Sequence, residues 1–161
     1  MDSLHAPWRI EYILSPKPEA KTGLFARIAQ SSDDEANLVI ARDRTGFALL
    51  NRYPYNGGHL MVVPYKEAAD LNGLTDEEVG DLWKLARRCL NALSAVMKPD
   101  GFNLGINLGK VAGAGIHEHL HIHIVPRWSG DTNFMPVIAG TSVVPDALTE
   151  IAAKLRAELA K

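Results

Sequence analysis

The sequence predicts one α+β domain built on a mostly antiparallel sheet of about five strands, with one long helix and a helix at the C-terminus. The 161 residues are 47% hydrophobic and 22% charged, which is typical of a globular domain. Short apolar runs alternate with turn-forming residues, as consecutive antiparallel strands do. Two segments have helical apolar spacing. No repeat or linker divides the chain, so we expect a single domain over residues 1–161.

The first strands are expected after residues 1–35, a lead-in rich in proline and polar residues that should add little to the core. Residues 37–42 and 46–51 are apolar runs separated by a turn sequence, which predicts an antiparallel hairpin. A third strand is expected over residues 59–63, because Pro64 follows it directly.

The main helix is predicted to start at Thr75, since Glu78 stands three residues later and completes a capping box. Apolar residues recur at helical spacing as far as Val96, and Pro99 ends the pattern. Cys89 lies beside this apolar stripe, where we expect a buried structural thiol.

The rest of the chain predicts two more strands and a final helix. Strands are expected over residues 102–107 and about 116–125, joined by the glycine-rich stretch 109–115. Residues 145–161 are predicted to be helical, because Ile151, Leu155 and Leu159 stand four residues apart.

Charge and cysteine content exclude several classes of function. The formal net charge of −2 provides no basic field for long nucleic acid. A single cysteine allows neither an internal disulfide nor a multi-cysteine zinc site, and it suits a reducing compartment. No apolar run approaches the roughly 18 residues of a membrane-spanning helix, and the first residues do not resemble a secretion signal. We therefore expect a cytoplasmic protein.

Histidines dominate residues 117–128, and their spacing points to a functional site. On a strand, alternate side chains face opposite ways, so His117, His119, His121 and His123 would share one face. Leu120, Ile122 and Ile124 would face the core. Several imidazoles on one face repel when they are charged together, which makes a purely structural row costly.

Two chemistries use such a row of imidazoles. The first is metal binding, but Glu118 would face the apolar side, and Val125 and Pro126 stand where a carboxylate ligand would be expected. A carboxylate from elsewhere in the chain would still complete a metal site. The second chemistry is attack of a neutral imidazole on phosphorus, which gives a covalent intermediate that another acceptor cleaves.

The run from His119 to Val125 resembles the signature of the histidine triad (HIT) superfamily, His-x-His-x-His followed by two apolar residues. Residues 51–54 and 57–64 resemble the nucleoside-binding segment of that family. Residues 6–9, 112–128, 130–131 and 133–134 resemble a bacterial branch that includes diadenosine tetraphosphate phosphorylases. The resemblance covers roughly residues 5–145 and implies the HIT-like fold and a homodimer.

This resemblance implies a role for each matching residue. His121 matches the family's nucleophile, which attacks the α-phosphorus of a nucleotide and carries a covalent nucleotidyl group. His119 and His123 would orient it and contact phosphate oxygens, and His59 matches an upstream histidine of the same pocket. Asn51 matches a ribose contact, although the residue alone indicates a turn at a strand end.

The glycine-rich stretch before the triad has two interpretations, a plain turn or a loop whose amides face a leaving phosphate. Gly113 and Gly115 are the candidates for that contact, and Lys110 would add positive charge or remain solvated. Asn107 is a candidate because family members often place Gln or Asn one position later, where this chain has Leu108.

The metal expectation follows from a departure from the family. Relatives often carry a zinc-binding Cys-x-x-Cys near the N-terminus, but residues 23–26 here contain no cysteine, and Glu67 replaces a further histidine ligand. We therefore expect no structural zinc and no tightly bound cofactor. A divalent cation that accompanies the substrate's phosphates remains compatible with the sequence.

The resemblance implies cleavage of diadenosine polyphosphates through a histidine–AMP intermediate, resolved by phosphate or by water. Two alternatives remain open: a phosphoramidase acting on AMP-linked amines, and a nucleotide-binding module without turnover. The expected partners are a nucleotide or dinucleoside polyphosphate and a second copy of the chain, with neither long nucleic acid nor a membrane. A metal-dependent oxygenase or hydrolase is the rival from the metal interpretation.

Overall fold

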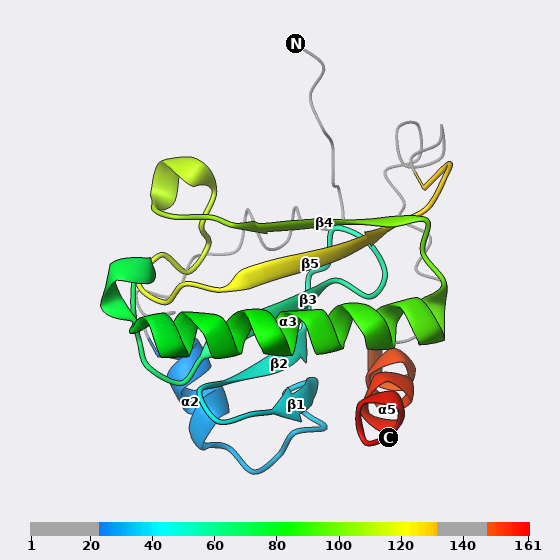
Figure 1. Ribbon diagram of the computed structural model, residues 1–161, viewed down its shortest axis with the longest axis horizontal. Coiled ribbons are helices and arrows are strands. Elements are labelled where there is room, and N and C mark those ends of the chain that lie inside the picture. The colour runs from blue at the N-terminus through cyan, green and yellow to red at the C-terminus, as the bar shows by residue number, and fades with distance from the viewer. Residues whose placement is uncertain (1–22, 132–147) are drawn as a thin grey trace.

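The computed structural model describes residues 23–131 and 148–161. The helices are α2 (Leu24–Gln30), α3 (Asp76–Met97) and α5 (Leu148–Leu159), and the strands are β1 (Val39–Arg42), β2 (Gly46–Leu50), β3 (Leu60–Pro64), β4 (Gly101–Ile106) and β5 (Ile122–Arg127) (Figure 1). Short 3-10 helices, η2 (Leu71–Gly73) and η3 (Lys110–Ala112), lie in loops. The family-like residues 6–9 and 133–134 lie outside the described residues.

The sheet has five strands in the order β1-β2-β3-β5-β4, and each neighbouring pair is antiparallel. This confirms the predicted α+β class and the antiparallel sheet. β5 comes last in the chain but lies between β3 and β4, with Met61 of β3 opposite His123 of β5. The inserted strand therefore brings the residue 59–64 segment beside the histidine cluster.

The predicted hairpin forms between β1 and β2, and its turn is closed by a hydrogen bond from Asp43 N–H to the Gly46 carbonyl oxygen at 2.8 Å. Gly46 is required by close packing: a Cβ there would overlap the carbonyl oxygen of Val63 and the side chain of Leu82. The glycine thus lets α3 lie close against β2 and β3.

Helix α3 begins at the predicted capping box. The Thr75 hydroxyl accepts a hydrogen bond from Glu78 N–H at 3.2 Å, and the Glu78 carboxylate accepts one from Thr75 N–H at 2.7 Å. Cys89 lies on the buried stripe of this helix, and burial raises the pKa of its thiol to about 12. The prediction of a buried structural thiol is confirmed.

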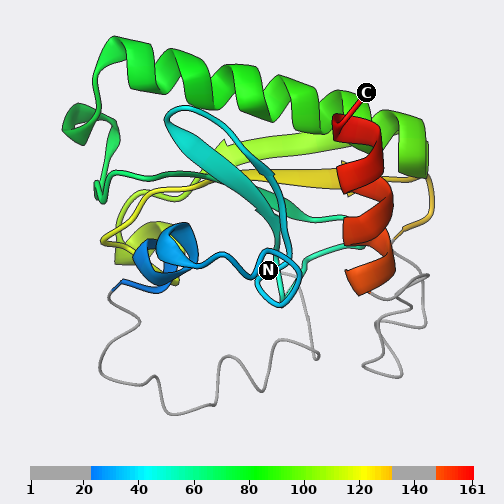
Figure 2. The same ribbon diagram turned by 90° about the horizontal axis from the view of Figure 1, so that it is seen from below.

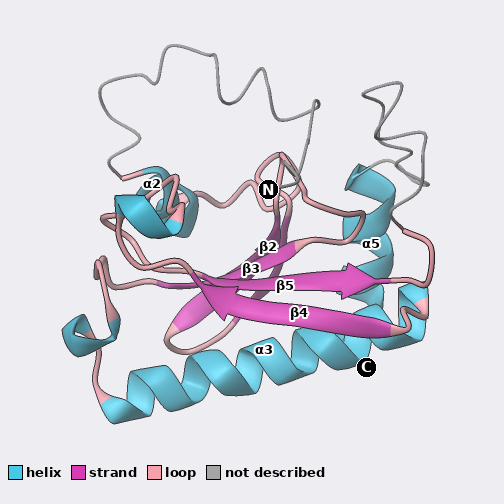
Figure 3. Ribbon diagram, turned by 90° about the horizontal axis from the view of Figure 1, so that it is seen from above, coloured by secondary structure: helices cyan, strands magenta, loops and turns pink. Residues whose placement is uncertain are grey.

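The two faces of the sheet are covered differently. Helix α3 lies on one face with α5 packed beside it, and α2 lies on the opposite face (Figures 2 and 3). Both Ile151 and Leu155 of α5 are buried in the core on the α3 face, which confirms the predicted C-terminal helix. Within residues 23–131 and 148–161, no helix combines the length and the apolar character needed to cross a membrane.

The expectation that residues 1–35 add little to the core is wrong for α2. Phe25 is 1% exposed and Ile28 is buried, and both join Phe47, Met61 and other residues in a second core on the α2 face. The spacing of Phe25 and Ile28 is that of one helix face, but the surrounding polar and turn-forming residues hid the short helix.

The predicted strand from residue 116 to residue 125 starts later, at Ile122. β3 ends at Pro64, and its carbonyl oxygen accepts a hydrogen bond from the His119 ring at 2.8 Å. Leu120 N–H donates to the Ala68 carbonyl oxygen at 2.7 Å. His119 and Leu120 are therefore held by contacts to Pro64 and Ala68 outside the ladder, and His117, His119 and His121 precede the strand that contains His123.

Candidate active site

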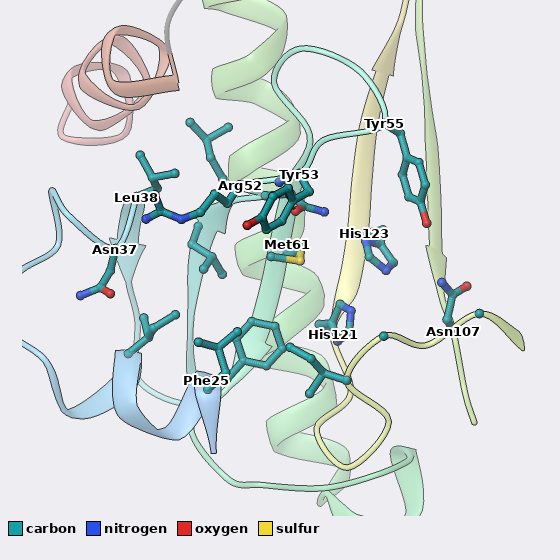
Figure 4. A pocket seen from close by; sticks show the side chains of 18 residues that line it. Phe25, Asn37, Leu38, Arg52, Tyr53, Tyr55, Met61, Asn107, His121 and His123 are labelled. Atoms are coloured by element: carbon teal, nitrogen blue, oxygen red, sulfur yellow. Dashed lines mark hydrogen bonds between the residues drawn. The ribbon is translucent and has the colours of Figure 1, made fainter. Parts of the chain in front are cut away.

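A cavity of about 300 Å³ opens on the α2 face of the sheet (Figure 4). Its apolar walls come from α2, β2, β3 and neighbouring segments, and include Leu24, Phe25, Ile28, Leu38, Leu49, Met61 and Ile116. Its polar side chains include Asn37, Asn51, Asn107, His121 and His123. Such a mixture suits a ligand with a flat apolar part and a polar or charged part.

His121 lies in the middle of this cavity, and its tautomer is fixed by the backbone. The Nδ1 atom lies 3.0 Å from the carbonyl oxygen of His119, which can only accept a hydrogen bond, so Nδ1 carries the proton. The Nε2 atom then has a lone pair. An imidazole held in this state can attack an electrophile without first losing a proton.

Burial keeps His121 neutral. The side chain is 6% exposed, and this burial lowers its pKa from the ordinary 6.5, while the hydrogen bond to His119 opposes the shift. Phe25 supplies part of the apolar surroundings, with its ring centroid 5.2 Å from that of His121. At neutral pH the nucleophilic form of His121 therefore predominates.

His123 has a tautomer set by a short chain of hydrogen bonds. Tyr55 N–H donates to His59 Nδ1 at 3.1 Å, so the proton of the His59 ring is on Nε2. His59 Nε2 lies 2.9 Å from His123 Nδ1, which must therefore accept. The proton of neutral His123 is then on Nε2, and this ring provides a donor beside the acceptor atom of His121.

His119 is 2% exposed and does not line the cavity. Its Nε2–H is given to Pro64, and its Nδ1 has no hydrogen-bond partner. The expected contact with phosphate oxygens is therefore not supported by its position. Its backbone carbonyl instead orients His121.

The structure brings some of the other candidate residues to the cavity and not others. The predicted residues that line it are Asn51, Asn107, Gly113, Gly115, His121 and His123. His59 lies behind His123, and Lys110 lies in η3 outside the cavity lining. Asn107 lines the cavity where its exposed neighbour Leu108 does not.

Asn51 has both a structural and a site position. Its carboxamide oxygen accepts a hydrogen bond from Tyr53 N–H at 2.9 Å, which is the turn contact expected of an asparagine at a strand end. Its Nδ2 atom lies 3.4 Å from His59 Nδ1. The same side chain lines the cavity, so the two interpretations of Asn51 are compatible.

Much of the cavity wall comes from residues that the sequence pattern did not single out. Phe25 and Ile28 come from the overlooked helix α2, and Asn37 and Leu38 come from the loop before β1. The spacing of Phe25 and Ile28 after Gly23 was the available signal. The loop residues carry no pattern that distinguishes them from an ordinary turn.

Hydrogen bonds of Asn56 hold the loop before β3 against an ion pair at the end of β5. Arg127 binds Asp131 through Nε at 2.6 Å, and Asn56 donates to the same carboxylate at 2.9 Å. These contacts hold the pKa of Asp131 well below its usual range. Neither Arg127 nor Trp128 lines the cavity, so this cluster has a structural position.

The residues at the family's zinc position do not fit zinc. Residues 23–26 begin α2, where Leu24 and Phe25 line the cavity and carry no metal-donor atom. Across residues 23–131 and 148–161, no three His, Cys, Asp or Glu side chains gather closely enough to hold a metal ion.

Comparison with known proteins agrees with this geometry. The HIT domain family model matches residues 32–130. The AP-4-A phosphorylase of Mycobacterium tuberculosis is 41% identical over 168 aligned positions, which cover 100% of this chain and 86% of that protein. The Bis(5'-adenosyl)-triphosphatase of Dictyostelium discoideum is 41% identical over 81 residues, 50% of this chain and 54% of that protein.

A solved structure supports the fold match. The zinc-bound histidine triad family protein of Mycobacterium smegmatis superimposes with a TM-score of 0.68 and 31% sequence identity, covering 85% of this chain and 92% of that one. The family model covers the chain from the turn before Asn37 to the end of β5, and so every described cavity-lining residue except those of α2. On the sequence match, the shared fold and the arrangement of the histidines, the chain belongs to the HIT domain family.

Proposed function

We propose that this protein cleaves diadenosine polyphosphates by nucleotidyl transfer through His121. The observation that carries the proposal is the hydrogen bond from His121 Nδ1 to the His119 carbonyl oxygen, which leaves the Nε2 lone pair in the cavity. The 41% identity with a protein named AP-4-A phosphorylase, over the whole chain, supports this substrate class. It also favours phosphate over water as the final acceptor.

The first step forms a bond between His121 Nε2 and the α-phosphorus of diadenosine tetraphosphate. The bond from that phosphorus to the bridging oxygen breaks, and the electron pair leaves with ATP. AMP remains on His121. His123, with its proton on Nε2, is the proposed donor to an oxygen of the reacting phosphates.

In the second step an acceptor oxygen attacks the phosphorus and breaks the phosphorus–nitrogen bond, which restores His121. Inorganic phosphate yields ADP, whereas water yields AMP. The two routes therefore give different products from the same intermediate. Gly113 and Gly115 line the cavity and are candidates for contacts with phosphate oxygens.

Product analysis tests this proposal. Purified protein is incubated with diadenosine tetraphosphate, with and without phosphate, and the nucleotides are separated by ion-exchange chromatography. We expect ATP and ADP, formed only when phosphate is present. ATP and AMP without phosphate would make the protein a hydrolase, and the absence of any cleavage would refute the proposal.

Two further arms separate the rival functions. Release of AMP from adenosine 5′-phosphoramidate, without cleavage of diadenosine tetraphosphate, would favour the phosphoramidase. Nucleotide binding without turnover of either compound would favour a binding module. A series with EDTA and with added magnesium tests the proposed divalent cation, which would shield the phosphates of the substrate.

The proposal includes a homodimer formed through β4. This strand is an edge of the sheet, and its residues Asn103, Leu104 and Gly105 are exposed. An exposed edge strand with an apolar side chain is suited to pairing with another chain. Light scattering tests for the homodimer, and a monomer in solution would refute this part of the proposal.

The proposal also includes a cytoplasmic location, which the single, buried cysteine supports.

A further inference from the structure

A polar side chain, that of Asn37, lies at the end of the cavity farthest from His123. Asn37 and Leu38 lie at one end, His121 lies between, and His123 with Asn107 lies at the other end (Figure 4). Between Asn37 and His121 most of the wall is apolar, and Phe25, Ile28 and Leu38 are buried there. The Arg52 side chain also lines this end, where it donates a hydrogen bond to the Ala36 carbonyl oxygen (Figure 4). A nucleoside whose phosphate reaches His121 would have its base in this apolar section.

The carboxamide of Asn37 has a defined orientation. Its Nδ2 atom donates to the Asp33 carbonyl oxygen at 2.7 Å and to the Ser31 hydroxyl at 3.0 Å. Because a backbone carbonyl can only accept, the amino group must face Asp33 and the oxygen must face away from it. Figure 4 shows this oxygen on the side of the carboxamide nearer the other cavity-lining side chains.

The backbone around Asn37 is also held firmly. Asn37 N–H donates to the Asp33 carbonyl oxygen at 3.2 Å, and Arg52 donates to the carbonyl oxygen of Ala36 at 2.8 Å. Leu38, the next residue, has a φ of 57°, a left-handed conformation that bulky residues rarely adopt. This rare conformation occurs where two consecutive residues, Asn37 and Leu38, both line the cavity.

We infer that Asn37 Oδ1 accepts a hydrogen bond from the exocyclic amino group of adenine, which makes Asn37 a base-specificity residue. The inference rests on the proposed function, in that the cavity takes a nucleotide. Apolar walls bind the faces of any base alike, so they do not select among bases. A fixed acceptor selects, because it gains a bond from an amino group and repels a carbonyl oxygen at the same position.

Calorimetric binding of three nucleotides tests the inference without requiring turnover. The nucleotides are AMP, purine riboside 5′-monophosphate, which lacks the amino group, and inosine 5′-monophosphate, which has an oxygen there. We expect AMP to bind about fivefold more tightly than the purine analogue, as one neutral hydrogen bond provides. The inosine nucleotide should bind more weakly than the purine analogue.

The variant Asn37→Ala should bind AMP and the purine analogue equally. Two control variants separate base recognition from a general effect on the loop. Ser31→Ala removes one partner of the Asn37 amino group and keeps the acceptor oxygen, so the preference for AMP should remain. Asn91→Ala makes the same substitution at an exposed position of α3 and should change nothing.

Equal binding of AMP and the purine analogue by the native protein would overturn the inference. An unchanged preference of Asn37→Ala for AMP over the purine analogue would also overturn it. A third contrary result is that Asn37→Ala changes only the discrimination between AMP and 2′-deoxy-AMP, which would place Asn37 at the ribose. The inference and the proposed function fail separately. A protein that prefers AMP but leaves diadenosine tetraphosphate intact would refute the cleavage and leave the role of Asn37 standing.

Discussion

The two faces of the sheet differ in what they bury. The face under α3 and α5 is lined by aliphatic side chains and Cys89, with no buried histidine among the residues of that core. The α2 face has a smaller core beside the cavity and the histidines. Alternation along β5 and the residue before it separates the two faces, since Ile122 and Ile124 face α3 while His121 and His123 face the cavity.

Stability and chemistry are divided between the two faces of the sheet. The buried polar residues of the described chain are His59, His119 and His121. His119 leaves Nδ1 without a partner, which costs about 1–3 kcal/mol relative to a hydrogen-bonded group. Among the residues that the structure describes, the α3 face buries no such unpaired side-chain atom, and it supplies the larger core. We therefore expect substitutions at the cavity to lower activity and substitutions on the α3 face to lower the free energy of unfolding.

The largest effect is expected for His121→Ala. Loss of the nucleophile should lower kcat for diadenosine tetraphosphate by at least roughly 10⁴-fold, while AMP binding stays within about tenfold, because the lost bond forms only during reaction. Steady-state kinetics and calorimetry measure the two quantities. Undiminished turnover would contradict the assignment of His121.

A substitution on the other face should have the reverse signature. Leu85→Ala removes a buried side chain of α3 and should lower the free energy of unfolding by about 3 kcal/mol. Urea denaturation measures this loss. The folded fraction should retain its kcat, and a large fall in kcat per folded molecule would show that the two faces are coupled.

Substitution of Arg42 should affect both stability and substrate binding. Its guanidinium binds the Asp34 carboxylate at 2.7 Å and the carbonyl oxygens of Ile28, Ala29 and Ser31, which holds α2 and the following turn together. Lysine lacks this forked geometry. Arg42→Lys should lower the free energy of unfolding by about 1–2 kcal/mol and raise KM more than it lowers kcat.

The effect of Arg42→Lys is checked by measuring stability and kinetics on the same variant and on a matched control. Urea denaturation and steady-state kinetics are run on Arg42→Lys and on Arg44→Lys, whose arginine makes exposed ion pairs with Glu77 and Asp81. The control should be nearly silent, because exposed ion pairs contribute little. Equal changes in KM for both variants would exclude a specific effect of Arg42 on the cavity wall.

The smallest effect concerns pH. His121 reacts when neutral and its pKa is lowered by burial, so kcat/KM should persist at pH values below 6.5 before it falls. Phe25→Ala exposes the ring and should move this acid limb to higher pH. Phe47→Ala, in the same core but stacked on Tyr65, should leave the limb in place.

The same pKa shift has a consequence for stability with a defined sign. The folded pKa of His121 lies below the unfolded value of about 6.5, so the unfolded chain takes up the proton first as the pH falls. This contribution to stability is complete above the unfolded pKa and is lost between that value and the folded pKa. His121→Ala should remove this part of the pH dependence of urea denaturation.

The sequence predicted the elements whose signals are local. Thr75 and Glu78 form the expected cap, and the turn between β1 and β2 closes as its residues indicate. β5 was predicted to start too early because alternation alone cannot show that the His119 ring replaces a backbone donor at Pro64. When a side chain such as the His119 ring bonds to a strand carbonyl in place of a backbone N–H, the alternation of apolar and polar residues in the sequence does not change.

The site was predictable where residue type carries the chemistry. His121 and His123 were singled out by their spacing, and Asn51 and Asn107 by the resemblance to the HIT family; the four side chains line one cavity, and their roles in it stay predictions. The cavity wall formed by Asn37 and Leu38 was not predictable. These residues face the cavity through a left-handed conformation at Leu38 that no short motif encodes. Contacts distant in the chain, such as those of Arg42 and Arg52, hold that turn.

The buried thiol on α3 has a practical consequence. Maleimide dyes react with exposed thiolates, and Cys89, the only cysteine of the chain, is buried with a pKa of about 12. The native protein is thus an unreactive background for labelling. Val111, fully exposed in η3 between Asn107 and Gly113, is the natural attachment point. A dye on Val111→Cys would report by its fluorescence when a nucleotide enters, before any bond is broken.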